Sequence, residues 1–225
     1  MKIAKVFIDT NILKFSATEL PRLAPRKQSL NWGGNNIEVT VHDSVEINRN
    51  DLIKNNDALK AETELLRPLA EIGKQGALNY VMNVETELES WGIPNMDSRG
   101  GRFYGAPIQI VEAPFKYERT VASSASGSDN LQFDFLRSLA HPRFTELQKM
   151  TGAYQGERGP NKNQLIDAFH LWCAEHNKCD FFLTLDLKLI KVLSLLPSKT
   201  TVQVVPPSKL LLWTSNELSK SNPGK

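Results

Sequence analysis

Residues 6–11, Val-Phe-Ile-Asp-Thr-Asn, form an apolar run that ends abruptly in three polar side chains. The run closes a longer stretch, residues 2–8, whose β-branched and aromatic side chains predict a buried strand. A carboxylate directly after such a strand is costly unless its charge is compensated. Asp9 is therefore either the N-cap of a following helix or part of a site shared with a cation or with other residues.

Three further apolar runs resemble the first, at residues 77–83, 181–185 and 201–205. Helical spacing of apolar residues covers 57–76, 163–178 and 185–197, with a kink or restart expected at Pro68. Strands that alternate with helices predict an α/β fold of three layers, in which a parallel sheet carries helices on both faces. Ligands of such sheets bind at the carboxyl ends of the strands, which is where Asp9 lies.

Two stretches depart from this alternation. Residues 28–43 alternate apolar and polar side chains after Gly33-Gly34, which predicts a β-hairpin. Residues 92–160 are rich in Gly, Ser and Pro, with a helical pattern over 133–150 that is interrupted at Pro142. We expect one domain over residues 1–225, with insertions at about 18–75 and 92–160.

The composition is that of an ordinary cytoplasmic protein. Of the 225 residues, 27 are Lys or Arg and 25 are Asp or Glu, and a net charge of +2 singles out no partner class. Two cysteines are too few for a disulfide scaffold, and no stretch is long enough to span a bilayer. The sequence also lacks the glycine-rich loop of P-loop NTPases and the Gly-x-Ser-x-Gly of serine hydrolases.

Carboxylates recur at the other strand ends. Glu85 and Glu87 follow the run at 77–83, Asp186 follows the run at 181–185, and Asp167 lies near the start of the helix before that run. If these groups converge with Asp9 at one sheet edge, their charges repel strongly. A divalent cation such as Mg²⁺ or Mn²⁺ removes that repulsion, because it prefers oxygen ligands.

The order of these motifs resembles the PIN-domain (PilT N-terminal-like) nuclease family, to which VapC-like toxins belong. The resemblance rests on FIDTN at 7–11, a glutamate after the second strand, and DAFHLWCAEHNKCDFFLTLDLKLI at 167–190, and it covers about half of the chain. It implies four catalytic and metal-binding acids that hold Mg²⁺ or Mn²⁺, namely Asp9, Glu87, Asp167 and Asp186. It also implies that Thr10 and Asn11 shape the turn and orient Asp9, and we expect Thr184 to support the Asp186 carboxylate or a water.

The glutamate of this set is ambiguous between Glu85 and Glu87. The family usually has Glu followed by Leu here, which favours Glu87 because Leu88 comes next. Glu85 then faces elsewhere on a helix, since residues on one helix face are three or four apart. We assign Glu89 to a charged helix surface. Singly, Asp9 and Asp186 are equally well explained as helix N-caps.

Several basic and polar residues are candidates for contacts with nucleic acid. Asn163 and Lys162 precede Asp167 on its helix and either touch a phosphate or form a solvated helix start. Arg99 and Arg102 stand beside two aromatic residues, a combination that suits unpaired RNA bases but also suits a surface loop over buried aromatics.

A zinc site is not favoured. His170, Cys173, His176 and Cys179 recur every three residues, and such steps spread the side chains around a helix instead of converging. We expect the two thiols in the core and His170 as a packing or supporting residue.

The resemblance implies a metal-dependent endoribonuclease that leaves 5′-phosphate and 3′-hydroxyl ends. The partners expected are RNA, an antitoxin or regulatory protein, and a second copy of the chain, with no membrane. Two alternatives stay open: a catalytically silent PIN-like module that binds RNA or protein, and a nuclease that acts on DNA. The metal site itself does not separate RNA from DNA, because it reads phosphate and not the 2′-hydroxyl.

Overall fold

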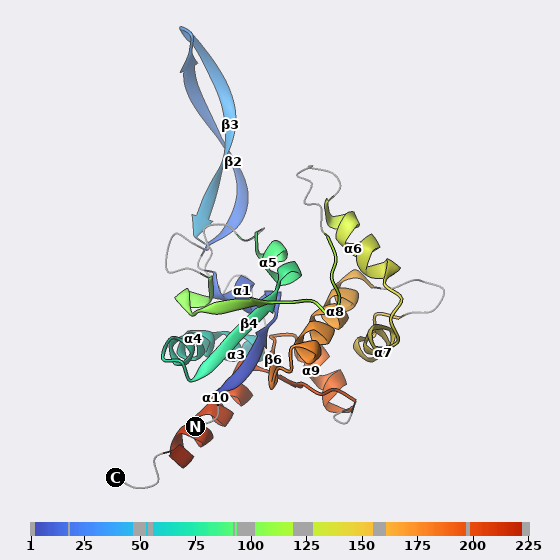
Figure 1. Ribbon diagram of the computed structural model, residues 1–225. Coiled ribbons are helices and arrows are strands. Elements are labelled where there is room, and N and C mark those ends of the chain that lie inside the picture. The colour runs from blue at the N-terminus through green and yellow to red at the C-terminus, as the bar shows by residue number, and fades with distance from the viewer. Residues whose placement is uncertain are drawn as a thin grey trace.

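The computed structural model describes residues 3–17, 19–46, 53, 56–91, 93, 102–118, 128–154, 161–196 and 199–221 (Figure 1). Arg99, one of the candidate RNA contacts, lies outside these residues. Five parallel strands make the central sheet: β1 (Ala4–Ile8), β4 (Leu78–Asn83), β5 (Ile108–Val111), β6 (Phe181–Leu183) and β7 (Gln203–Val205). Their order in space is β5-β4-β1-β6-β7, so β1 lies at the centre.

Helices cover both faces of this sheet (Figure 1). They are α1 (Thr10–Ser16), α3 (Asp57–Glu64), α4 (Leu66–Lys74), α5 (Val84–Ser90), α6 (Ser128–Ser138), α7 (Pro142–Thr151), α8 (Lys162–His176), α9 (Leu187–Ser194) and α10 (Pro207–Ser221). A short turn of 3₁₀ type, η1 (Arg102–Gly105), precedes β5. Among the described residues, no helix has the length and apolar character needed to cross a membrane.

The alternation of side chains along β1 divides the core in two. Val6 and Ile8 pack with apolar side chains of α1, α4 and α10 on one face of the sheet. Phe7 points to the other face, where it stacks on Phe182 and joins side chains of α7, α8 and α9. The predicted α/β class, with a parallel sheet between two helical layers, is therefore confirmed.

Both proline breaks lie where the sequence predicts them. The helical pattern at 57–76 divides into α3 and α4 at Leu65, because Pro68 has no N–H to continue the hydrogen-bond ladder. The pattern at 133–150 divides into α6 and α7, and Pro142 occupies the first turn of α7, where its missing N–H costs nothing.

The hairpin predicted at 28–43 forms and is longer than expected. Its strands are β2 (Glu19–Trp32) and β3 (Asn35–Glu46), joined by Gly33 and Gly34 at positive φ, where glycine is favoured. The ribbon projects from the body (Figure 1). Within the ranges predicted as insertions, α4 packs on the sheet and β5 is one of its strands.

Candidate active site

The strand order places a topological switch point at the carboxyl ends of β1 and β6. After β1 the chain passes to β4 and β5 on one side of the sheet, and after β6 it passes to β7 on the other. Neighbouring strands whose connections leave in opposite directions make the switch point where α/β sheets bind ligands. Asp9 follows β1 directly, and the stretch Thr184–Asp186 follows β6.

Asp9 is buried, with 4% of its surface exposed, and it does not cap a helix. It occupies the N-cap position of α1, but its carboxylate accepts no hydrogen bond from that helix. Its Oδ2 accepts hydrogen bonds from Asn11 Nδ2 at 2.5 Å and from Thr184 Oγ1 at 2.6 Å. The cap explanation is thus wrong for Asp9, whose carboxylate is held toward β6 by side chains.

Asn11 and Thr184 form a small polar scaffold between the two strand ends. Asn11 Nδ2 also donates to Thr184 Oγ1 at 2.9 Å, and Asn11 Oδ1 accepts from the Leu185 amide at 3.0 Å. Thr184 Oγ1 accepts from the amide of Asp186 at 3.0 Å, so it contacts the backbone of Asp186 and not its carboxylate. Both residues therefore fix Asp9, which Asn11 was expected to do and Thr184 was not.

Asp186 caps its own helix. One of its oxygens, Oδ1, accepts from the amides of Lys188 at 2.8 Å and Leu189 at 3.0 Å. These amides are among the first of α9, so the bond satisfies donors that have no partner within the helix. The carboxylate nevertheless lies close enough to Asp167 to raise the pKa of that residue.

The pKa of Asp167 is influenced by the other acids of this region. Burial and the negative charges of Asp9, Asp186 and Glu89 together raise the pKa of Asp167 to about 8, while His170 opposes them. Within the described residues no hydrogen bond to its carboxylate offsets this destabilisation. The charges of Asp9 after β1, Asp186 after β6 and Glu89 on α5 thus all act on Asp167 of α8.

The glutamate whose charge acts on Asp167 is Glu89 and not Glu87, the residue that the sequence favours. Glu89 accepts hydrogen bonds from the hydroxyl of Thr10 and, at 3.1 Å, from Gln132 Nε2. Glu87 instead pairs with Arg102, its Oε1 lying 2.8 Å from Nη1. The reason is helical phase: Glu89 is one turn beyond Glu85 on the inner face of α5, whereas Glu87 is rotated from either by about 200°.

His170 lies inside this acidic cluster. Its ring is fully buried, with Nδ1 3.8 Å from Asp9 Oδ1 and Nε2 3.8 Å from Glu89 Oε1. Burial alone lowers its pKa, but the charges of Glu89, Asp9 and Asp167 outweigh burial and raise the pKa above its usual value. Thr86 Oγ1 lies 3.3 Å from Nε2 and is its nearest hydrogen-bonding group.

Glu85 forms a buried network behind Glu89. Its carboxylate is fully buried and accepts from Tyr117 Oη and Gln132 Nε2, each at 2.9 Å. Burial raises the pKa of Tyr117, which keeps the phenol protonated and able to donate. Gln132 Nε2 lies against both Glu85 and Glu89, so α6 and the segment after β5 help to hold α5 in place.

The remaining candidates lie around the cluster or away from it. Thr10 contacts Glu89, while Asn163 is exposed in the first turn of α8 and Lys162 is the first residue of that helix.

Arg102 is held by Glu87, and the next residue, Phe103, is buried. The aromatics of this loop are thus packing groups: Phe103 lies edge-on to Tyr80, and Tyr104 lies under Arg67.

The donor set suits Mg²⁺ or Mn²⁺ in chemistry and in charge. Carboxylate oxygens are the ligands these ions prefer, and acidic neighbours contribute to the raised pKa of Asp167. In the described part of the chain, however, no three His, Cys, Asp or Glu side chains are already grouped so that they could hold an ion. The residues therefore fit a divalent cation in ligand type and charge, but they do not form a complete coordination site.

Comparisons with known proteins name no family for the chain. No protein-family model matches it, no curated protein matches it, and no solved structure matches it.

Proposed function

We propose that this protein hydrolyses phosphodiester bonds of RNA with the help of Mg²⁺ or Mn²⁺. The site consists of Asp9, Glu89, Asp167 and Asp186. One observation carries the proposal: the charges of Asp9, Asp186 and Glu89 act on the buried Asp167 near the sheet's switch point, and together with burial they raise its pKa to about 8. A protein that keeps such an arrangement without a bound cation gains nothing in stability from it.

The resemblance to PIN-domain nucleases supports the same assignment, with Glu89 in the place we first gave to Glu87. The five-stranded parallel sheet between helices is compatible with a PIN-like fold. Asp9, Asp167 and Asp186 match the aspartates of that family, and all three belong to the cluster.

The side chains of the cluster have separable roles in this proposal. Asp9, Asp167, Asp186 and Glu89 would hold the cation, which supplies the charge that stabilises the phosphate in the transition state and activates the attacking water. Asn11 and Thr184 orient Asp9 through the bonds of 2.5 and 2.6 Å to its Oδ2. Thr10 and Gln132 orient Glu89 in the same way. His170 compensates part of the negative charge while no cation is bound.

Cleavage assays test the activity. End-labelled single-stranded RNA and DNA of the same sequence are incubated with the protein in Mn²⁺, in Mg²⁺ and in EDTA. We expect RNA cleavage that requires the metal and that falls by at least about 100-fold in Asp9→Asn and Asp167→Asn. Glu89→Gln should lose activity, whereas Glu87→Gln, outside the cluster, should keep most of it. Full activity in correctly folded Asp9→Asn and Asp167→Asn ends the assignment.

Thermal melting tests cation binding without relying on activity. Because a bound divalent ion replaces the proton of Asp167, Mn²⁺ should raise the melting temperature of the wild type, and more so at pH 8 than at pH 6. Asp9→Asn should lose most of this response, and Glu87→Gln should retain it. Metal-independent melting of the wild type, combined with no cleavage of either nucleic acid, identifies a silent module, and cleavage of DNA alone identifies a DNA nuclease.

A further inference from the structure

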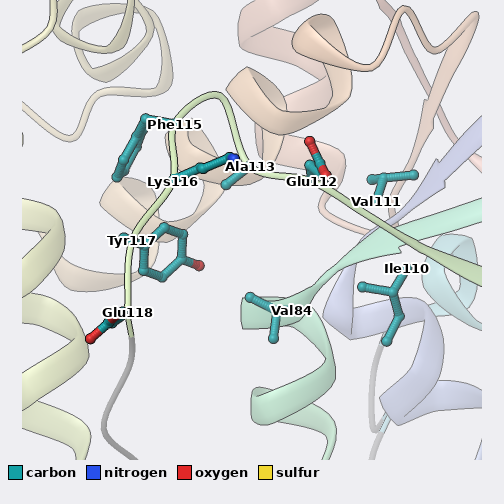
Figure 2. A pocket seen from close by; sticks show the side chains of 9 residues that line it. All are labelled: Val84, Ile110, Val111, Glu112, Ala113, Phe115, Lys116, Tyr117 and Glu118. Carbon is teal, nitrogen blue, oxygen red and sulfur yellow. The ribbon is translucent and has the colours of Figure 1, made fainter.

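The β5 edge of the sheet carries a cavity separate from the acidic cluster. Its volume is about 870 Å³, and it lies between the start of α5, strand β5 and the segment that follows β5 (Figure 2). The lining residues are mostly apolar: Val84, Ile110, Val111, Glu112, Ala113, Phe115, Lys116, Tyr117 and Glu118. The mechanism proposed above uses none of these side chains for chemistry.

The strand beside the cavity is the last one on its side of the sheet. β5 pairs on its inner side with β4, from Tyr80 opposite Ile108 to Asn83 opposite Val111. In the part of the chain that the structure describes, no strand pairs with its outer side. Ile110 is 53% exposed on this strand. An unpaired edge with an apolar side chain is a template for another extended chain.

The cavity wall is fixed by contacts that do not depend on a ligand. Tyr117 stands across the cavity from Ile110, with Val84 between them (Figure 2). The Tyr117 hydroxyl donates to Glu85 at 2.9 Å, and its ring stacks on Phe135 with centroids 4.8 Å apart. A rigid apolar hollow next to a strand edge suits a single apolar side chain of an added strand, because preorganisation lowers the cost of binding.

The charges around the cavity favour a basic ligand over a phosphate. Glu112 and Glu118 are exposed beside one lysine, Lys116, which leaves a net charge of −1. Among the described residues, no ion pair joins either glutamate to a basic side chain. Two carboxylates without a partner attract Lys or Arg and repel a sugar-phosphate backbone.

We propose that β5 and the segment 112–118 bind an extended peptide of a partner protein. The peptide adds a strand to the outer edge of β5, inserts an apolar side chain into the cavity, and places a Lys or Arg beside Glu112 or Glu118. This binding site is independent of the hydrolysis proposed above, and the two can fail separately.

A random library of linear decapeptides, displayed on phage, is the probe. The library is selected on the wild-type protein and counter-selected on Ile110→Lys, which places a charge on the strand edge at a position exposed enough to tolerate it. We expect the recovered peptides to share an apolar residue with Lys or Arg one or two positions away. Labelled copies should bind the wild type, and affinity should fall by about tenfold or more in Ile110→Lys and in the double variant Glu112→Lys/Glu118→Lys.

The matched control is Leu212→Lys, at another exposed leucine on α10, which should bind the peptides as the wild type does. Raising the salt concentration should weaken binding to the wild type and leave the weaker binding of the double variant almost unchanged. Three results overturn the proposal: no peptide is recovered, the recovered peptides carry no basic residue, or they bind Ile110→Lys equally well. A labelled RNA decamer that shifts the amide signals of residues 108–118 in EDTA likewise shows that the occupant is a nucleic acid.

Discussion

Asp9 and Asp186 occupy equivalent positions after neighbouring strands, yet their carboxylates have different partners. Asp186 accepts amide donors at the start of α9 through Oδ1. Asp9 has the same opportunity in α1 but is held by Asn11 and Thr184 instead. An acid whose neighbours turn it away from a free helix end, toward other acids, loses the stabilisation of a cap.

The pH dependence of stability follows from Asp167. The pKa of Asp167 is about 8 in the folded protein, well above the ordinary value of 3.8. Between about pH 4 and pH 8 the folded chain therefore holds a proton that the unfolded chain releases. Stability must therefore fall as the pH rises from about 4 to about 8. His170, whose pKa is also raised, contributes in the same direction, since its stabilisation is lost as the pH rises through its folded pKa.

In EDTA, Asp167→Asn should flatten this dependence and should melt at a higher temperature than the wild type near pH 8.5. Thermal melts followed by circular dichroism at about pH 6, 7 and 8.5 measure the effect. Asp186→Ala is the contrast at pH 6, where Asp167 holds its proton, because it removes a helix cap and should lower the melting temperature there by the equivalent of about 1 kcal/mol. Parallel curves for the wild type and Asp167→Asn would show that Asp167 is not crowded.

The acid cluster was only partly predictable from residue types and spacing. Asp9, Asp167 and Asp186 were found because each stands at a strand or helix end, where topology limits the possible positions. Glu89 was missed because the choice between glutamates depends on the rotation of α5 about its axis. The spacing of four between Glu85 and Glu89 was the available signal for a shared face, but it does not say which face turns inward. Asn83, which caps α5 through the amide of Thr86, sets that rotation in the folded chain.

Gly73 allows α4 to approach the sheet. A Cβ atom at this position would lie 2.2 Å from Cε2 of Tyr80, whose ring is fully buried and edge-on to Phe103. Gly73→Ala should therefore lower the free energy of unfolding by about 2–3 kcal/mol, although alanine favours a helix. Urea denaturation measures the change. Lys74→Ala, exposed in the same helix, should stay within about 0.5 kcal/mol of the wild type, and an equal result for both variants would contradict the predicted clash.

At the scale of elements, α7 and α8 are joined by one arginine. Arg143 donates from Nε and Nη2 to the two oxygens of Glu175, at 2.8 and 2.6 Å, and from Nη2 to the carbonyl of Lys199 at 2.6 Å. The Glu175 carboxylate also accepts from the amide of Thr201 at 3.1 Å. The same guanidinium meets Glu146 on its own helix. α8 carries Asp167 and His170, so the contacts of Arg143 help to fix the helix that positions these two side chains.

The two ion pairs of Arg143 should differ in energy because they differ in burial. Only 7% of the Glu175 side chain is exposed, against 48% for Glu146. Arg143→Met leaves the Glu175 carboxylate buried without its partner and should cost about 3 kcal/mol. Glu146→Gln removes an exposed pair and should cost at most about 0.5 kcal/mol. If urea denaturation shows equal losses of unfolding free energy for the two variants, the Arg143–Glu175 ion pair contributes no more than a surface pair.

At the scale of the whole molecule, the sequence predicted the layers better than the boundaries between them. The strands β1, β4, β6 and β7 were predictable because each is a compact apolar run. β5 was not predicted because it is only four residues long and lies within the Gly-, Ser- and Pro-rich stretch 92–160; Ile110 stays exposed at the sheet edge. The pattern of α4 was visible, but its place in a central layer was not, since periodicity alone does not say what a helix packs against.

The β2–β3 ribbon has two chemically distinct faces. Cross-strand pairs put Leu30 opposite Ile37 and Gln28 opposite Val39 on one face, with Trp32 and Val41 on that side as well. The other face is polar, with the pairs Lys27–Thr40, Ser29–Glu38 and Asn31–Asn36. The apolar face does not complete the core, because Trp32 is 75% exposed and Ile37 is 47% exposed.

Removing the outer ribbon should therefore leave the body folded. We propose to replace residues 26–41 by Asn-Gly, which closes a two-residue turn between the paired residues Pro25 and His42. The melting temperature should change by no more than about 2 °C, because the deleted side chains contribute almost no buried area to the sheet and helices. Circular dichroism melts compare the two proteins, and amide hydrogen exchange in β1 and β4 checks the core.

A drop of more than about 5 °C, with faster exchange in β1, would show that the ribbon supports the body through contacts at its base. The unpaired apolar face makes a second comparison informative. Trp32→Ser, which keeps the ribbon and removes its largest exposed apolar side chain, should likewise leave melting unchanged and should reduce any concentration-dependent association seen in sedimentation. These two results together would show that the central layers determine the stability of the protein and that the apolar face of the ribbon determines its association.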